Sequence, residues 1–172
     1  MVGRLMESAQ RPNASPRALT TVRTPARSLS STRQRLANRE WGSALIGRGL
    51  VKVERLGWCE SGALAERAVG PVHLVFDGGR GLFVSGRSDW SLEVVETAPG
   101  DSAWLTAYDY DWHGSRWVLR DASGEAPFAA VIAERLAALE PVRDEVGEVV
   151  GLDLGFGGRT VTLRMSEGEV TT

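Results

Sequence analysis

Three polar residues at alternate positions, Asp109, Asp111 and His113, form the most chemically suggestive pattern in this sequence. Alternation along a strand would place them on one face, where two carboxylates and an imidazole could converge on a divalent metal ion. The alternative is a solvated hairpin face on which Asp111 pairs across the hairpin with Arg116. We favour the solvated face, because the sequence offers no further ligands, and the metal site stays open as the alternative.

Five aromatic residues form a second candidate site. Tyr and Trp are frequent in binding hot spots and in ligand pockets. They are also the side chains that a sheet buries, and the opposite face of the predicted hairpin is polar. We therefore expect core residues here, with Trp112 beside the turn partly exposed. The set comprises Trp104, Tyr108, Tyr110, Trp112 and Trp117.

The other chemistry-bearing residues form no catalytic set. His73 lies in an apolar stretch and is expected to be a hydrogen-bonded structural residue. Cys59, the only cysteine, is expected to be a buried thiol, since no basic neighbour would lower its pKa. The sequence has no GxSxG elbow, no GxxxxGK[ST] loop and no glycine fingerprint followed by a helix. We therefore predict no cofactor and lean against an enzyme.

The charge is unevenly distributed. Residues 1–40 carry eight arginines against two glutamates, whereas the rest of the chain carries twelve basic and twenty acidic residues. An acidic body repels nucleic-acid phosphates. It favours a basic protein partner, or it simply keeps the protein soluble. The expected partner contacts are Asp109, Asp111, Trp112 and Arg116.

The N-terminal segment differs in composition from the rest. Residues 1–38 are rich in Arg, Ser and Thr and contain three prolines, which predicts a disordered basic arm ahead of one domain over 39–172. A targeting segment, or a start site placed too far upstream, fits the same composition. No apolar run approaches the ~18 residues of a membrane span, and no secretory signal is present. We expect a cytoplasmic protein with no membrane partner; the oligomeric state is not indicated.

Three hairpins are predicted from alternation and turn residues. The first covers 72–86. The second covers 104–121 around a His113-Gly114 turn and pairs residue 111 with 116, 110 with 117, 109 with 118, and 108 with 119. The third covers 149–165 around Gly157-Gly158 and pairs residue 154 with 161 and 152 with 163. Further strands are expected at 49–58 and 90–95.

One helix is predicted over 126–140. Its apolar residues follow helical spacing, and prolines stand near its start and just after its end. The sum is an α+β domain: an antiparallel sheet of about seven or eight strands built from hairpins, with this helix packed on one face. A small rolled sheet or barrel is the alternative. The apolar residues are Phe128, Val131, Ile132, Leu136 and Leu139.

The segments LVFDGGRGLFV, WSLEVVE and GLDLGFGGRTVTLRM resemble those of small uncharacterised β-rich proteins of high-GC (actinobacterial) genomes. Some of these resemble immunity proteins encoded beside secreted toxins. The resemblance implies no catalytic residues. Our leading hypothesis is a non-enzymatic cytoplasmic binding protein, immunity-like, that engages a basic partner. The alternatives are a small-molecule or divalent-metal-binding domain with enzymatic activity, and a structural subunit of a larger assembly.

Overall fold

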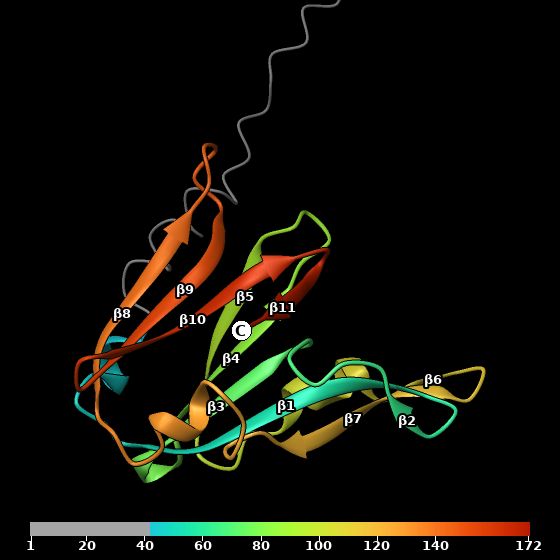
Figure 1. Cartoon of the computed structure of the whole chain (residues 1–172), viewed down its shortest axis with the longest axis horizontal. Helices are drawn as coiled ribbons and strands as arrows, with labels where there is room; N and C mark the ends of the chain where they lie inside the picture. The colour runs from blue at the N-terminus through green and yellow to red at the C-terminus, as the bar shows by residue number, and fades with distance from the viewer. Residues whose placement is uncertain (1–41) are drawn as a thin grey trace, which may run out of the picture.

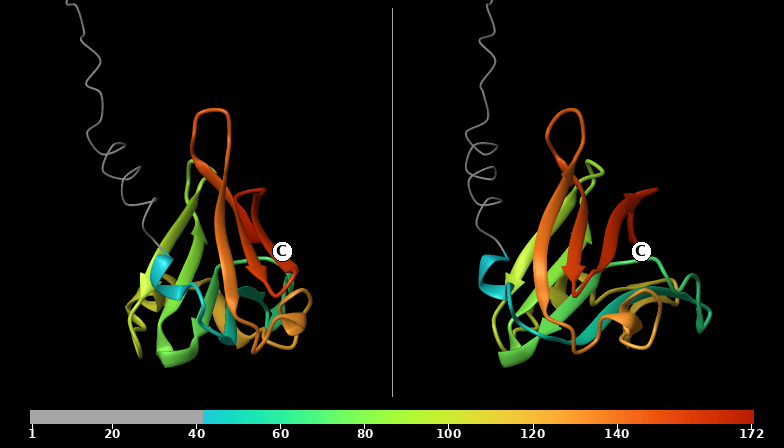
Figure 2. Two further views of the ribbon diagram at one scale, coloured as in Figure 1. Left: turned by 90° about the vertical axis from the view of Figure 1, so that its left-hand side faces the viewer. Right: turned by 60° about the vertical axis from the view of Figure 1, so that its left-hand side comes forward.

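Two antiparallel β-sheets face each other across one apolar core (Figures 1 and 2). A computed structural model describes residues 42–172, so the predicted arm of residues 1–38 lies outside the described residues. No helix among residues 42–172 combines the length and apolar composition needed to cross a membrane.

The larger sheet has the strand order β5-β4-β3-β1-β7-β6, with β2 paired to the end of β1. The smaller sheet has the order β11-β10-β9-β8. The bounds of the strands are β1 Leu50–Glu60, β2 Ala63–Leu64, β3 Val72–Phe76, β4 Gly81–Gly86, β5 Leu92–Thr97, β6 Asp111–Trp112, β7 Ser115–Asp121, β8 Leu136–Arg143, β9 Val149–Phe156, β10 Arg159–Ser166 and β11 Glu169–Thr171. Four short 3-10 turns complete the elements: η1 Ser43–Leu45, η2 Asp77–Gly79, η3 Ala103–Tyr108 and η4 Phe128–Ala130.

Two of the predicted hairpins are confirmed. β3 and β4 pair across 72–86, with residue 72 opposite 84, and η2 forms their turn. β9 and β10 pair as expected, with Leu154 opposite Val161 and Leu152 opposite Leu163. All four of these side chains are buried, so the alternation in the sequence identified the core face of the smaller sheet correctly.

The helix predicted over 126–140 is wrong. The chain forms η4, then β8 from Leu136, and Ala133 between them has φ 68°, outside the right-handed helical region. Phe128, Val131 and Leu136 are nevertheless buried, so the apolar residues are core residues in a different backbone conformation. Pairing of β8 with β9 outweighs the local helix propensity. Pro141 is tolerated because β8 is an edge strand.

This difference changes the fold class. No helix of seven or more residues occurs in the described part of the chain, and two antiparallel sheets supply the core. The predicted α+β architecture with a main helix on the sheet is therefore wrong. The single rolled sheet or barrel is not observed either, because the second sheet occupies the face that the helix was expected to cover.

The second predicted hairpin is correct only near its turn. Asp111 pairs with Arg116, and His113 and Gly114 form the turn with φ 53° and 84°. Before Asp111 the chain leaves the strand and forms η3, so the pairs 110–117, 109–118 and 108–119 do not form. The strand expected at 90–95 begins at Leu92 and extends to Thr97.

Candidate functional site

The face of the larger sheet that is turned away from the smaller sheet, here called the outer face, carries a connected row of aromatic rings. η3 crosses this face on the way from β5 to β6. Successive ring centroids lie 4.5–6.3 Å apart in the order His73, Trp104, Phe83, Tyr108, Trp117, Trp58, Tyr110. Such distances are favourable for aromatic contacts, so the row stabilises the crossing segment.

The prediction that the five aromatic residues are core is therefore wrong. None of them belongs to the buried core: Trp104, Tyr108 and Trp117 are half-buried, and Tyr110 and Trp112 are 49% and 65% exposed. The apolar core lies on the other face of the same sheet. The exposure predicted for Trp112 beside the turn is confirmed.

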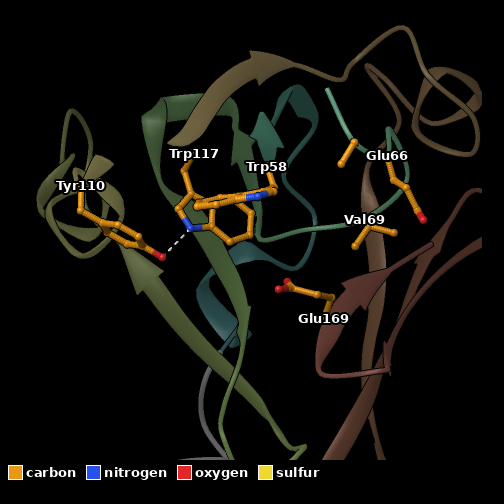
Figure 3. Close-up of a pocket in the computed structure, with 7 residues that line it drawn as sticks. Trp58, Glu66, Val69, Tyr110, Trp117 and Glu169 are labelled. Carbon is orange, nitrogen blue, oxygen red and sulfur yellow. Dashed lines mark hydrogen bonds between the residues drawn. The ribbon is translucent and has the colours of Figure 1, made fainter. Parts of the chain in front are cut away.

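A cleft of about 440 Å³ opens at one end of this aromatic row (Figure 3). Trp58 and Trp117 face each other across β1 and β7, with their rings 5.4 Å apart and inclined at 66°. Tyr110 forms the next wall, and its hydroxyl accepts a hydrogen bond of 2.9 Å from Trp117 Nε1. The opposite wall consists of Ala65, Glu66, Val69 and Glu169.

Glu169 is the electrostatic feature of the cleft. Its side chain extends from β11 towards the space beside the two tryptophans (Figure 3). Among the described residues no ion pair or hydrogen bond reaches this carboxylate. Burial alone raises its pKa above the ordinary value. The exposed carboxylate of Glu66 adds further negative charge to the same cleft.

Together these aromatic rings and carboxylates favour binding of a positively charged ligand. The face of an aromatic ring attracts an ammonium or guanidinium group, by about 0.5–2 kcal/mol per contact depending on solvation. An unpaired carboxylate that is partly removed from water gains most when a cation arrives, because its desolvation is then compensated. The cleft holds three aromatic walls and two carboxylates, and no basic residue of the described part of the chain lines it.

No protein family, curated protein or solved structure matches this chain. The resemblance to β-rich, immunity-like proteins therefore stays a prediction.

The predicted metal ligands are not brought together. Asp109 borders a second cavity on the outer face, whereas Asp111 pairs with Arg116 on the opposite face. Asp111 Oδ1 accepts a hydrogen bond of 2.8 Å from the Gly114 backbone, and the His113 ring packs against Trp112. Residues 42–172 contain no group of three or more His, Cys, Asp or Glu side chains that could hold a metal ion.

The four predicted partner contacts divide between two faces. Trp112 lies on the outer face, one row beyond the cleft, and Asp109 is exposed at the edge of the second cavity. Asp111 and Arg116 point to the other side of the β6–β7 hairpin. A partner that covers the cleft would therefore contact Trp112 and Asp109 more readily than Asp111 and Arg116.

A carboxylate–imidazole–hydroxyl chain lies under the aromatic row. His73 Nδ1 is 3.0 Å from Glu54 Oε2, and His73 Nε2 is 2.8 Å from Thr97 Oγ1. Burial opposes ionisation of Glu54, but hydrogen bonds from Lys52 and His73 outweigh it, so its pKa is lowered. An ionised Glu54 orients the ring so that Nδ1 donates to the carboxylate and Nε2 accepts from the threonine.

The hydrogen-bonded series of Glu54, His73 and Thr97 resembles a hydrolase triad in its connectivity, but a substrate cannot reach it. His73 and Thr97 are only 7% and 4% exposed, and the Trp104 ring lies 4.8 Å from the imidazole. A nucleophile must reach its substrate, so we assign these residues a structural role, as predicted for His73. Cys59 is half-buried rather than buried and is a free thiol.

Gly81 leaves space for the hydrogen bond between His73 and Thr97, and its replacement tests how this space affects stability. A Cβ at Gly81 would collide with His73 Nε2 and Thr97 Oγ1 and would lie 2.9 Å from the Leu74 carbonyl oxygen. We expect Gly81→Ala to lower the free energy of unfolding by about 1–3 kcal/mol, measured by urea denaturation. Gly124→Ala is the matched control, because a Cβ there meets nothing within 4 Å. Equal stability of the two variants would contradict this role of Gly81.

Sequence reasoning missed most of the residues that line the cleft. It singled out Tyr110 and Trp117, but not Trp58, Glu66 or Glu169. Trp58 is paired with Trp117 only through the pairing of β1 with β7, which are about sixty residues apart. Glu169 comes from the other sheet altogether, and no local pattern in the sequence marks it.

Proposed function

We propose that this chain is a non-enzymatic binding protein that recognises a cationic group, a lysine or arginine side chain, on a basic protein partner. The observation that carries this proposal is the half-buried Glu169 carboxylate, which has no partner within residues 42–172 and faces Trp58, Trp117 and Tyr110. The cytoplasmic, immunity-like role expected from the sequence is part of the same proposal.

The charge of the whole body supports a basic partner. Residues beyond 40 carry twelve basic and twenty acidic groups. A negative field of this kind attracts a basic protein and raises its association rate. Tyr110 in the cleft wall and Trp112 outside it are exposed, and both belong to the residue types that dominate binding hot spots. The metal-binding and enzymatic alternatives have no comparable support, because neither the proposed ligands nor the buried His73 chain form an accessible site.

A direct test uses tryptophan fluorescence of the full chain titrated with N-acetyl-arginine amide, with N-acetyl-glutamine amide as the neutral comparison. We expect saturable binding of the cation only. Glu169→Gln should weaken that binding about tenfold or more, because a charge-assisted contact contributes about 1.5–3 kcal/mol. Glu167→Gln removes the same charge from the exposed turn next to β11, outside the cleft, and should change the affinity less than twofold. Equal binding of both amides, or equal effects of both variants, would contradict the proposal.

The same interaction predicts a pH dependence. Burial raises the pKa of Glu169, and a bound cation favours the ionised carboxylate. Affinity should therefore fall as the pH drops through this raised pKa, and Glu169→Gln should remove the dependence. Glu66 in the cleft and the phenols of Tyr108 and Tyr110 are the other titratable groups near it. The measurement is the same titration from about pH 4 to about pH 7.5.

The free energy of unfolding of the ligand-free protein should change in the opposite direction: the Glu169 contribution rises as the pH falls. The folded state binds the Glu169 proton more tightly than the unfolded state does, since the folded pKa is the higher of the two. This group therefore stabilises the folded protein as the pH falls through the same range.

An affinity that is constant over this range in the unaltered protein would contradict the assignment of Glu169 as the cation partner.

A further inference from the structure

The open edge of the larger sheet lies directly beside the cleft. β7 ends the sheet except where β6 covers it, and β6 pairs only with Ser115 and Arg116 (Figure 1). Within residues 42–172, residues 117–121 of β7 therefore have a strand, β1, on one side only. An uncovered edge of this kind presents unpaired backbone groups to which another chain can add as a strand.

The pairing with β1 determines which backbone groups point outward. Ala122 N–H donates to the Val53 carbonyl oxygen, whereas Leu56 N–H donates to Pro71, away from β7. Alternation then directs the backbone of Val118 and Arg120 towards β1 and the backbone of Leu119 and Asp121 towards the open edge. Among residues 42–172 no backbone hydrogen bond from outside the strand pairs reaches Leu119 or Asp121.

A second cavity of about 340 Å³ adjoins this edge on the outer face. Its walls combine the side chains of β1 and β7 with those of η3, and Leu119 within it is 38% exposed. The lining residues are Leu56, Leu105, Thr106, Tyr108, Asp109, Trp117 and Leu119. Trp117 lines both this cavity and the cleft, so the two cavities share one indole side chain.

We propose that the partner binds as an extended basic segment that adds to β7 along residues 117–121, with an apolar side chain in the second cavity. This inference rests on the proposed function, because the same segment would direct its cationic side chain into the cleft. The charge at the edge fits such a segment: Asp109 and Asp121 are exposed there, while Arg120 turns to the other face and pairs with Glu125. Backbone pairing would supply affinity, and the two cavities would select the side chains.

The test follows single amides of the full chain by NMR hydrogen exchange. The probe is the capped peptide Arg-Thr-Leu-Thr-Val-Thr, together with its reversed sequence to allow for strand direction. We expect bound peptide to protect the amides of Leu119 and Asp121 at least tenfold. The amides of Val118 and Arg120 serve as internal controls, because they already face β1. N-methylation of alternate peptide amides along one edge should abolish binding, and N-methylation along the other edge should not.

The outcomes separate the two proposals. Failure of N-acetyl-arginine amide to bind contradicts the cleft function, whatever the peptide does. Binding of that amide without any protection of Leu119 and Asp121 by either peptide overturns strand addition alone. Equal affinity of both N-methylated peptides also overturns it. Protection of the two amides that increases with protein concentration in the absence of peptide would assign the edge to a second copy of this chain, and would overturn the partner segment as its occupant.

Discussion

Trp117→Ala is expected to weaken binding of N-acetyl-arginine amide by about 30-fold or more, the loss of about 2 kcal/mol or more that is typical of a hot-spot tryptophan. The indole is a wall of the cleft, packs against Trp58 and Tyr108 at 5.4 and 5.6 Å, and holds the Tyr110 hydroxyl at 2.9 Å. Its removal therefore deletes one aromatic wall of the cleft. Tyr110, the next wall, then loses the hydrogen bond from Trp117 Nε1. The measurement is the fluorescence titration described above, with Trp58 as the remaining reporter in the cleft.

Two further variants keep this prediction falsifiable. Trp90→Ala makes the same chemical change at a 61% exposed position that lines neither cavity, and should leave the affinity within twofold. Trp117→Phe retains an aromatic face but lacks the Nε1 donor, so its affinity should lie between those of the alanine variant and the unaltered protein. Near-UV circular dichroism checks that each variant is folded. Equal affinities of folded Trp117→Ala and Trp90→Ala would place the cation elsewhere.

Arg55→Met is expected to stabilise the protein by about 1–4 kcal/mol, although Arg55 is one of the largest fully buried side chains. Its Nε and Nη1 atoms have no hydrogen-bond partner in the described part of the chain, and its Nη2 atom is 3.3 Å from Thr172 Oγ1. Burial, with repulsion from Arg120, lowers the pKa of Arg55 to about 10. Methionine fills a similar volume without a buried charge and can keep the contact with the Phe128 ring.

The sign of this prediction can be tested by urea denaturation at neutral pH. The lowered pKa means that the folded state disfavours the charged form of Arg55. The free-energy cost of burying this charge is therefore present at all pH values below that pKa. Arg159→Met, at an exposed position, is the matched control and should change the free energy of unfolding by less than about 0.5 kcal/mol. A loss of about 3 kcal/mol or more in Arg55→Met would show instead that the buried charge is compensated.

The local hairpins could be predicted because their signals are contained in neighbouring residues. Gly157 and Gly158 adopt φ 48° and 93°, which glycine tolerates, and the alternation on either side sets the β9–β10 register. The same holds for the β3–β4 hairpin and for the turn at His113-Gly114. For β3–β4 and β9–β10 a shift of the register by one residue would move the apolar side chains out of the core, so only one register is stable.

Whether residues 126–140 form a helix or a strand could not be decided from those residues alone. The apolar residues at 128, 131 and 136 are buried in the observed fold as they would be in a helix. The backbone conformation of this segment depends on β9, whose edge pairs with β8 from Leu136 to Arg143 with two irregularities in the register. Propensity differs by only tenths of a kcal/mol per residue, so pairing with a neighbouring strand can reverse it.

The sequence by itself determined the hairpin turns, the core face of β9 and β10, the hydrogen-bonded position of His73, and the acidic charge of the body. Tertiary structure alone decided which residues line the cleft. Pairing of β1 with β7 brings Trp58 to Trp117, and packing of the smaller sheet brings Glu169 to both. Contacts between distant segments depend on how the two sheets pack, and a local pattern of residues carries no information about that arrangement.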